Sequence, residues 1–149
     1  MKIHAPTLSG FDSFVHDIMG VPVLALPYGA AITTHCFDIS LSVVLLELQG
    51  ISPENYVIAV YNLGGDLLIN YANDLTGQTY FAGLRQLFDI SKFVPGVVTN
   101  TSDEYTSAGL VNPKAMENLT MMDLQNLKTP YGRRYLGIAQ SFGPIWGIS

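Results

Sequence analysis

The sequence predicts a mainly α fold, a helical bundle with a long loop or β-ribbon excursion before the C-terminal helices. Three observations predict it: apolar residues recur at helical spacing, glycine or proline separates the helical segments, and a Ser/Thr-rich stretch at 97–111 breaks the pattern. A length of 149 residues suits one domain with a sizeable core. We therefore expect a single domain over 1–149, with an N-terminal extension and short helix in 1–33 and a C-terminal tail at 144–149.

The first third of the chain is expected to hold a short helix and then a buried one. Ser9 and Asp12 have the spacing of a capping box, which predicts a helix to about Met19. Its apolar side is Phe11, Phe14, Val15 and Ile18. Gly20 stops it, and two prolines favour an extended connection. From about Thr33 to Gln49 the chain is apolar nearly all round, which is typical of a central, buried helix.

Two more helices are predicted in the middle of the chain. Ser52 can cap the first of them and Pro53 suits its first position. Its apolar stripe is Val57, Val60, Tyr61, Gly64, Leu67, Leu68 and Tyr71. Gly64 and Gly65 cost about 1 kcal/mol each against alanine, which close approach of another backbone would offset. After a turn, the next helix is marked by Tyr80, Phe81, Leu84, Leu87 and Phe88.

The C-terminal part combines the irregular excursion with two helices. A loop or two-stranded ribbon at 97–111 is expected to be functional, because long irregular insertions usually are. The near capping box at 120–123 opens a short helix to about Leu127. Thr129 is expected to cap the last helix, with Pro130 at its first position. The predicted stripe of that helix is Tyr131, Tyr135, Ile138 and Phe142, and Gly143-Pro144 ends it.

The composition predicts a subunit that buries much of its surface against neighbours. Hydrophobic residues make up 48% and charged residues 13% of the chain, with a mean hydropathy of +0.29. A membrane protein is the other interpretation, but the longest apolar run, 36–51, contains Asp38 and Glu47 and falls short of the roughly 20 residues a span needs. We therefore expect an oligomer rather than a monomer. The net charge of −5 leaves no broad basic face for nucleic acid.

No pattern of residues indicates catalysis, a metal or a cofactor. His35, Cys36 and Asp38 match no standard metal-ligand spacing, and nothing around Cys36 indicates an activated thiol. His16 and the adjacent aspartate do not face each other on a helix. The Gly-Gly pair lies inside a helical pattern, whereas a phosphate loop needs glycines between a strand and a helix. We expect the protein not to be an enzyme and to need no cofactor.

Arg133 and Arg134 lie on the side of the last helix away from most of the apolar stripe. Two interpretations stay open for them: a solvated face, or an intermolecular contact, since arginine suits ion pairs at interfaces. Arg85 and Lys128 are expected to face solvent. Trp146, the only tryptophan, lies in the tail, and tryptophan is favoured at the energetic centres of interfaces.

The order of these features resembles a known family. The excursion "GVVTNTSDEYTSAGLV" (96–111), then a short helix, then "LKTPYGRRYLGIAQSFG" (127–143) is similar to the head–tail connector, or adaptor, proteins of tailed bacteriophages. The resemblance covers roughly 56–143. It implies a ring of about twelve subunits in the phage neck that docks on the portal protein, extends the DNA channel and presents a surface to the next neck or tail protein.

The same resemblance sets the expected partners and sites. DNA would pass the ring without specific binding, no membrane would be involved, and the protein would reside in the virion, or in the host cytoplasm during assembly. The expected contacts to portal and neighbouring subunits are Arg133, Arg134, Trp146, Thr99, Thr101 and Tyr105. The alternative is a small cytoplasmic helical enzyme or ligand-binding domain with a pocket lined by tyrosines. A convergent set of titratable groups would favour the enzyme, and the chain shows none.

Overall fold

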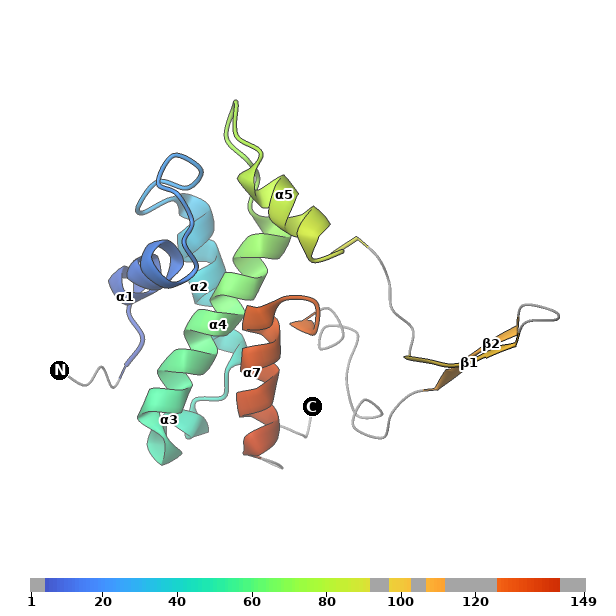
Figure 1. Cartoon of the computed structure of the whole chain (residues 1–149). Helices are drawn as coiled ribbons and strands as arrows, with labels where there is room; N and C mark the ends of the chain where they lie inside the picture. Colours follow the sequence, from blue (N-terminus) through green and yellow to red (C-terminus); the bar gives the residue numbers. More distant parts are fainter. Residues whose placement is uncertain (1–4, 92–96, 103–106, 112–125, 143–149) are drawn as a thin grey trace.

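The computed structural model describes residues 5–91, 97–102, 107–111 and 126–142, and within them the chain is mainly helical, which confirms that part of the prediction (Figure 1). The elements are α1 Leu8–Ser13, η1 Phe14–Ile18, α2 Ala31–Val43, α3 Glu47–Ile51, α4 Pro53–Tyr71, α5 Tyr80–Leu87, β1 Val97–Ser102, β2 Ser107–Val111 and α7 Pro130–Ser141. Predictions for Tyr105, the capping box at 120–123, Gly143-Pro144 and the tail with Trp146 lie outside the described residues.

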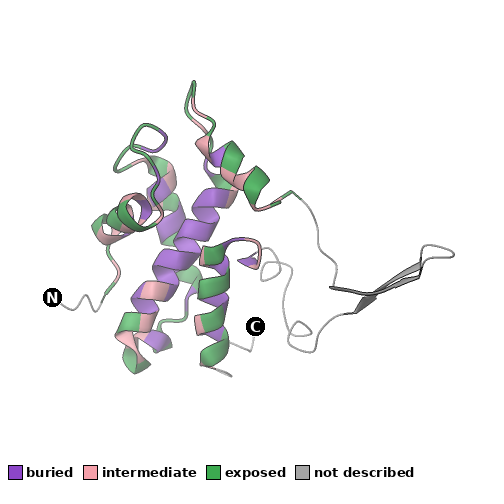
Figure 2. Cartoon of the chain, viewed as in Figure 1, coloured by how far each residue is buried: buried purple, intermediate pink, exposed green. Residues whose placement is uncertain are grey.

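Helix α4 is the centre of the helical body. From Tyr56 to Ile69 every residue except Ile58 is buried, and Figure 2 shows this helix as the most continuously buried element. It contacts α2, α3, α5 and α7. Pro53 occupies the first turn, where its missing N–H costs no hydrogen bond, so the predicted start is confirmed. The predicted cap is not formed, because the Ser52 hydroxyl accepts no hydrogen bond from a backbone N–H of the first turn and instead accepts one from the side-chain Nδ2 of Asn55 at 3.0 Å.

The prediction of one central helix over 33–49 is wrong in two respects. Helix α2 buries one face, made by Thr33, Cys36, Phe37 and Ser40, while His35 and Asp38 are exposed. The helix also ends at Val43, because Val44 takes an extended conformation with ψ of 125°. The chain then turns into α3, so two short helices meet at a corner where one long helix was expected.

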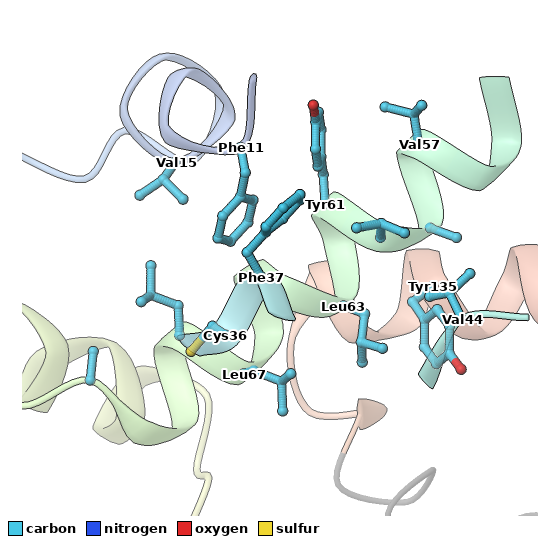
Figure 3. Close-up of a cluster of buried hydrophobic side chains, with 14 of the residues drawn as sticks. Phe11, Val15, Cys36, Phe37, Val44, Val57, Tyr61, Leu63, Leu67 and Tyr135 are labelled. Carbon is cyan, nitrogen blue, oxygen red and sulfur yellow. The ribbon is translucent and has the colours of Figure 1, made fainter. Parts of the chain in front are cut away.

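The aromatic core explains why α4 carries two glycines. Figure 3 shows Phe11, Phe37 and Tyr61 pointing toward one another from α1, α2 and α4, with ring centres 5.7 to 6.5 Å apart. A Cβ atom on Gly64 would lie 2.8 Å from the Phe11 ring, and one on Gly65 would lie 2.8 Å from the Met19 sulfur. The predicted approach of another backbone is therefore wrong, because the atoms nearest both glycines belong to side chains.

The N-terminal helix is fixed by a residue that differs from the predicted cap. Thr7, not Ser9, caps α1, because its hydroxyl accepts a hydrogen bond from the Gly10 amide at 3.0 Å. The Thr7 amide also donates to the Tyr61 hydroxyl at 3.1 Å, which holds the cap against α4. The chain continues as the π-helical turn η1, whose wider turn rotates Ile18 away from the side of Phe11. Ile18 is consequently 70% exposed, contrary to prediction.

The remaining elements are helix α5, which packs on α4, and strands β1 and β2 of the excursion. Helix α5 begins where the Asp74 carboxylate accepts hydrogen bonds from the Phe81 and Ala82 amides, at 2.8 and 2.9 Å. Tyr71 and Leu87, both predicted in apolar stripes, are the last residues of their helices and are exposed. Strands β1 and β2 pair antiparallel from Val97↔Val111 to Ser102↔Ser107, with an irregularity between residues 98 and 100.

Candidate functional site

The start of α7 is bound to the middle of α4 by one threonine. The Thr129 hydroxyl oxygen accepts a hydrogen bond from the Gly132 amide at 2.9 Å, and its hydroxyl proton is donated to the carboxylate of Asp66. Thr129 is completely buried. The predicted cap and the predicted Pro130 at the first position of the helix are both confirmed.

Asp66 is a buried acidic residue that the sequence analysis did not single out. It is 1% exposed, and burial raises its pKa from the ordinary 3.8 to about 7, although the hydrogen bond from Thr129 lowers it in part. The available signal was a single acidic residue in an otherwise apolar helical stretch, directly after the two glycines. The core therefore holds a carboxyl group whose pKa burial raises to about 7.

The chain before α7 passes very close to the first turn of that helix. A Cβ atom on Gly132 would lie 2.0 Å from the backbone carbonyl oxygen of Asn126. Asn126 is itself buried, so little room exists for the carbonyl to move. Glycine at 132 is thus required for this crossing, independently of its conformational freedom.

The buried face of α7 is rotated relative to the predicted stripe. The residues that are fully buried are Gly132, Tyr135, Leu136 and Ala139. Of the predicted stripe, only Tyr135 belongs to this group, and Tyr131, Ile138 and Phe142 are half-buried. On that side Gly132 lets the chain at Asn126 pass close to the first turn of α7. The rotation leaves Tyr131 at the edge of the interface with α4.

A groove opens at this edge, between η1, α4 and α7. Its volume is about 410 Å³, and the lining includes Phe14, Ile18, Ile58, Asn62, Tyr131 and Arg134. The rings of Phe14 and Tyr131, which both line it, meet edge to face with centres 6.2 Å apart. We call this concavity the α7 groove. Its walls are largely apolar, and a guanidinium group lies among them.

The two arginines of α7 differ in their surroundings. Arg134 is exposed and lines the α7 groove. Arg133 is also exposed, but its guanidinium donates a hydrogen bond to the Leu127 carbonyl at 3.2 Å, within its own chain. The structure therefore distinguishes one arginine beside a concave surface from one directed to its own backbone.

The other predicted residues are distributed as follows. Thr99 and Thr101 lie on β1, whereas Tyr105 and Trp146 are outside the described residues. Arg85 does not simply face solvent, because its Nε donates to the Ile69 carbonyl at 2.9 Å. Lys128 likewise donates to the Ile90 carbonyl at 2.7 Å. These two cations bind helix ends and turns of their own chain, so that prediction is wrong.

The residues considered for chemistry are not assembled into a site. His35 and Asp38 are exposed on α2, while Cys36 faces the core. The Nδ1 of His16 is hydrogen-bonded to the Val21 carbonyl oxygen at 2.8 Å, and its ring lies 4.1 Å from that of Tyr28. Over the described ranges, no three His, Cys, Asp or Glu side chains come together as a metal ion would require. Over the same ranges, no helix combines the length and apolar character that crossing a membrane demands.

No protein-family model, curated protein or solved structure matches the chain. The α7 groove is thus understood from its own geometry. Apolar walls favour an apolar side chain, and Arg134 favours a carboxylate beside it. A protruding apolar residue that is followed or preceded by an acidic one has the matching chemistry.

Proposed function

We propose that the protein is a structural subunit of a phage neck, which forms a ring that joins the portal to the tail and extends the DNA channel. The observation that carries the proposal is the placement of large exposed apolar side chains at both ends of the helical body. One group is Val23, Leu24, Tyr28, Tyr71 and Leu75, and the other is Val43, Leu45, Leu46 and Ile51.

The antiparallel course of α2 and α4 separates these groups. The loop before α2 and the end of α4 lie at one end of the body, and the turn from α2 through α3 into α4 lies at the other (Figure 1). Exposed apolar residues that gather in patches are uncommon on soluble monomers and usually mark association. A subunit that contacts neighbouring copies and also the proteins on either side of its ring needs more than one such surface.

Further support comes from charge and from the resemblance. A net charge of −5 suits a channel along which DNA moves without binding. The partners under this proposal are other copies of the chain, the portal protein and the next neck or tail protein. The virion neck is the proposed location, reached from the host cytoplasm during assembly.

The particle mass tests the proposal. We expect mass photometry and electron microscopy of the purified chain, alone and mixed with the portal protein of the same phage, to show rings. A compact monomer at micromolar concentration that also ignores the portal would contradict it. That outcome would favour the alternative, a small cytoplasmic helical ligand-binding domain or enzyme, for which Tyr61 and Tyr131 in the α7 groove are the specific observation.

The excursion is proposed to add a contact between subunits or to the tail. In the two-stranded sheet, each of β1 and β2 has one edge without a strand partner in that sheet, and such edges pair readily with another chain. Deleting residues 100–107 is expected to leave the helical circular dichroism signal nearly unchanged and to abolish ring formation. If the chain that lacks residues 100–107 forms rings of normal size and amount, the excursion does not contribute a contact between subunits.

A further inference from the structure

The corner between α2 and α3 is a fixed protrusion. Val44 and Leu48 are both buried, at 3% and 0% exposed, and hold the chain on either side of it. Between them Leu45, Leu46 and Glu47 are exposed, with Leu46 at 66%. We call Leu45–Glu47 the α2–α3 corner. An apolar side chain held out in water by two buried anchors loses little conformational freedom when it binds, so it is prepared for a partner.

The α7 groove carries the charge opposite to that of the α2–α3 corner. Among the described residues that line it, Arg134 is the only charged one, and the rest are Asn62, proline, isoleucine and aromatic side chains. The corner offers a leucine pair followed directly by Glu47. The groove thus combines apolar walls with one positive charge, and the corner combines two leucines with one negative charge. This complementarity makes the corner of another copy a suitable occupant of the groove.

The groove and the middle of helix α2, which precedes the corner, lie on different sides of α4. Ile58 lines the groove, whereas Gly64 faces α2, since a Cβ atom there would lie 3.4 Å from the Ser40 hydroxyl. At 100° per residue, these two positions are about 120° apart around the helix axis. Because Val44 and Leu48 hold the corner to its own core, it is not free to reach the groove of the same chain.

We propose that the α2–α3 corner of one copy docks in the α7 groove of the next copy, with Leu46 among the apolar walls and Glu47 paired with Arg134. The inference rests on the proposed self-assembly and names the surfaces that carry it. The contact is heterologous, because each copy gives its corner to one neighbour and its groove to another. A series of such contacts closes into a ring when the rotation between copies allows it.

Two single variants and their mixture test the proposal. Leu46→Asp places a charge on the corner and leaves the groove intact. Arg134→Glu reverses the charge in the groove and leaves the corner intact. Each alone is expected to weaken self-association about tenfold or more in sedimentation. An equal mixture is expected to form a 1:1 dimer and nothing larger, because one intact corner meets one intact groove. Adding Glu47→Arg to the Arg134→Glu chain is expected to restore assembly.

Matched controls lie on the same helices. Gln140→Glu places a negative charge at an exposed residue of α7 that does not line the groove, and His35→Asp places a charge on the exposed side of α2. Both are expected to assemble like the unchanged chain, and circular dichroism of all variants should show the same helix content. Where assembly occurs only on the portal, the same variants are scored on that ring.

The outcomes separate this inference from the proposed function. If the unchanged chain forms rings and both single variants form them equally well, the docking proposal is wrong and the ring function stands. The docking proposal is also wrong if the mixture stays monomeric. Loss of portal binding by Arg134→Glu with unchanged contacts between copies would assign the groove to the portal and overturn the second copy as occupant. An unchanged chain that neither assembles nor joins the portal contradicts both proposals.

Discussion

Replacing Asp66 with asparagine is expected to raise the free energy of unfolding at pH 8 by about 4 kcal/mol and to leave it nearly unchanged below about pH 4. Burial raises the pKa of Asp66 from 3.8 to about 7, and each pH unit corresponds to about 1.36 kcal/mol. Between these values the folded state holds a proton that the unfolded state releases. The stability from the protonated group is therefore complete below 3.8 and is lost as the pH rises through about 7.

Asparagine imitates the protonated carboxyl group, so it avoids the cost of a buried charge. Its amide oxygen can still accept the hydrogen bond from Thr129. Urea unfolding of both chains from pH 4 to 8 measures the difference, which should grow across this window. Asp38→Asn is the control, since Asp38 is exposed on α2 and its replacement removes no buried carboxyl group. An Asp66→Asn chain that is less stable than the original at pH 8 would show that the carboxylate itself holds α7.

Replacing Gly132 with alanine is expected to destabilise the fold by about 3 kcal/mol, at the upper end of the usual cost of overpacking. The added Cβ would lie 2.0 Å from a backbone oxygen, and no rotation of a side chain can relieve that contact. The chain around Asn126 or the first turn of α7 must shift instead. Such a shift pulls Thr129 away from Asp66, so the loss includes part of that hydrogen bond.

Gly137→Ala is the matched control on the same helix. Gly137 is exposed, and nothing lies within 4 Å of the position a Cβ would take. There alanine only improves helix propensity, so a gain of about 1 kcal/mol is expected. Thermal unfolding of the two variants should move in opposite directions. Equal shifts of the same sign would mean that the crossing beside Gly132 is not rigid.

Signals that act within a few residues were predictable from the sequence. Proline at the first helical position fixes the starts of α4 and α7, because its restricted φ and missing N–H suit only that turn. The capping role of Thr129 was predictable for the same reason, because it depends only on the residues that directly follow it, beginning with Pro130. The mainly α class followed from several such segments together.

Features decided by distant contacts were not predictable. Thr7 and Ser9 both carry a hydroxyl, and the choice depends on Tyr61, which lies 54 residues from Thr7 in the sequence. Asp66 finds its partner 63 residues away. The end of α2 at Val43 was not predictable, because the apolar run continues through Val44, Leu45 and Leu46. Such a run does not show which of its residues face the core and which face solvent. The different roles of Arg133 and Arg134 likewise depend on where η1 and α4 lie beside α7.

The burial of Cys36 has a practical consequence for work on this protein. The thiol is 1% exposed, and burial raises its pKa to about 11, so roughly one molecule in a thousand carries the reactive thiolate at pH 8. Maleimide dyes and cross-linkers should therefore react with cysteines introduced at the surface and spare the native one while the helices stay packed. Fluorescent labels can be placed at chosen positions without first removing Cys36. The rate at which Cys36 itself is slowly modified then measures how often α2 separates from the core.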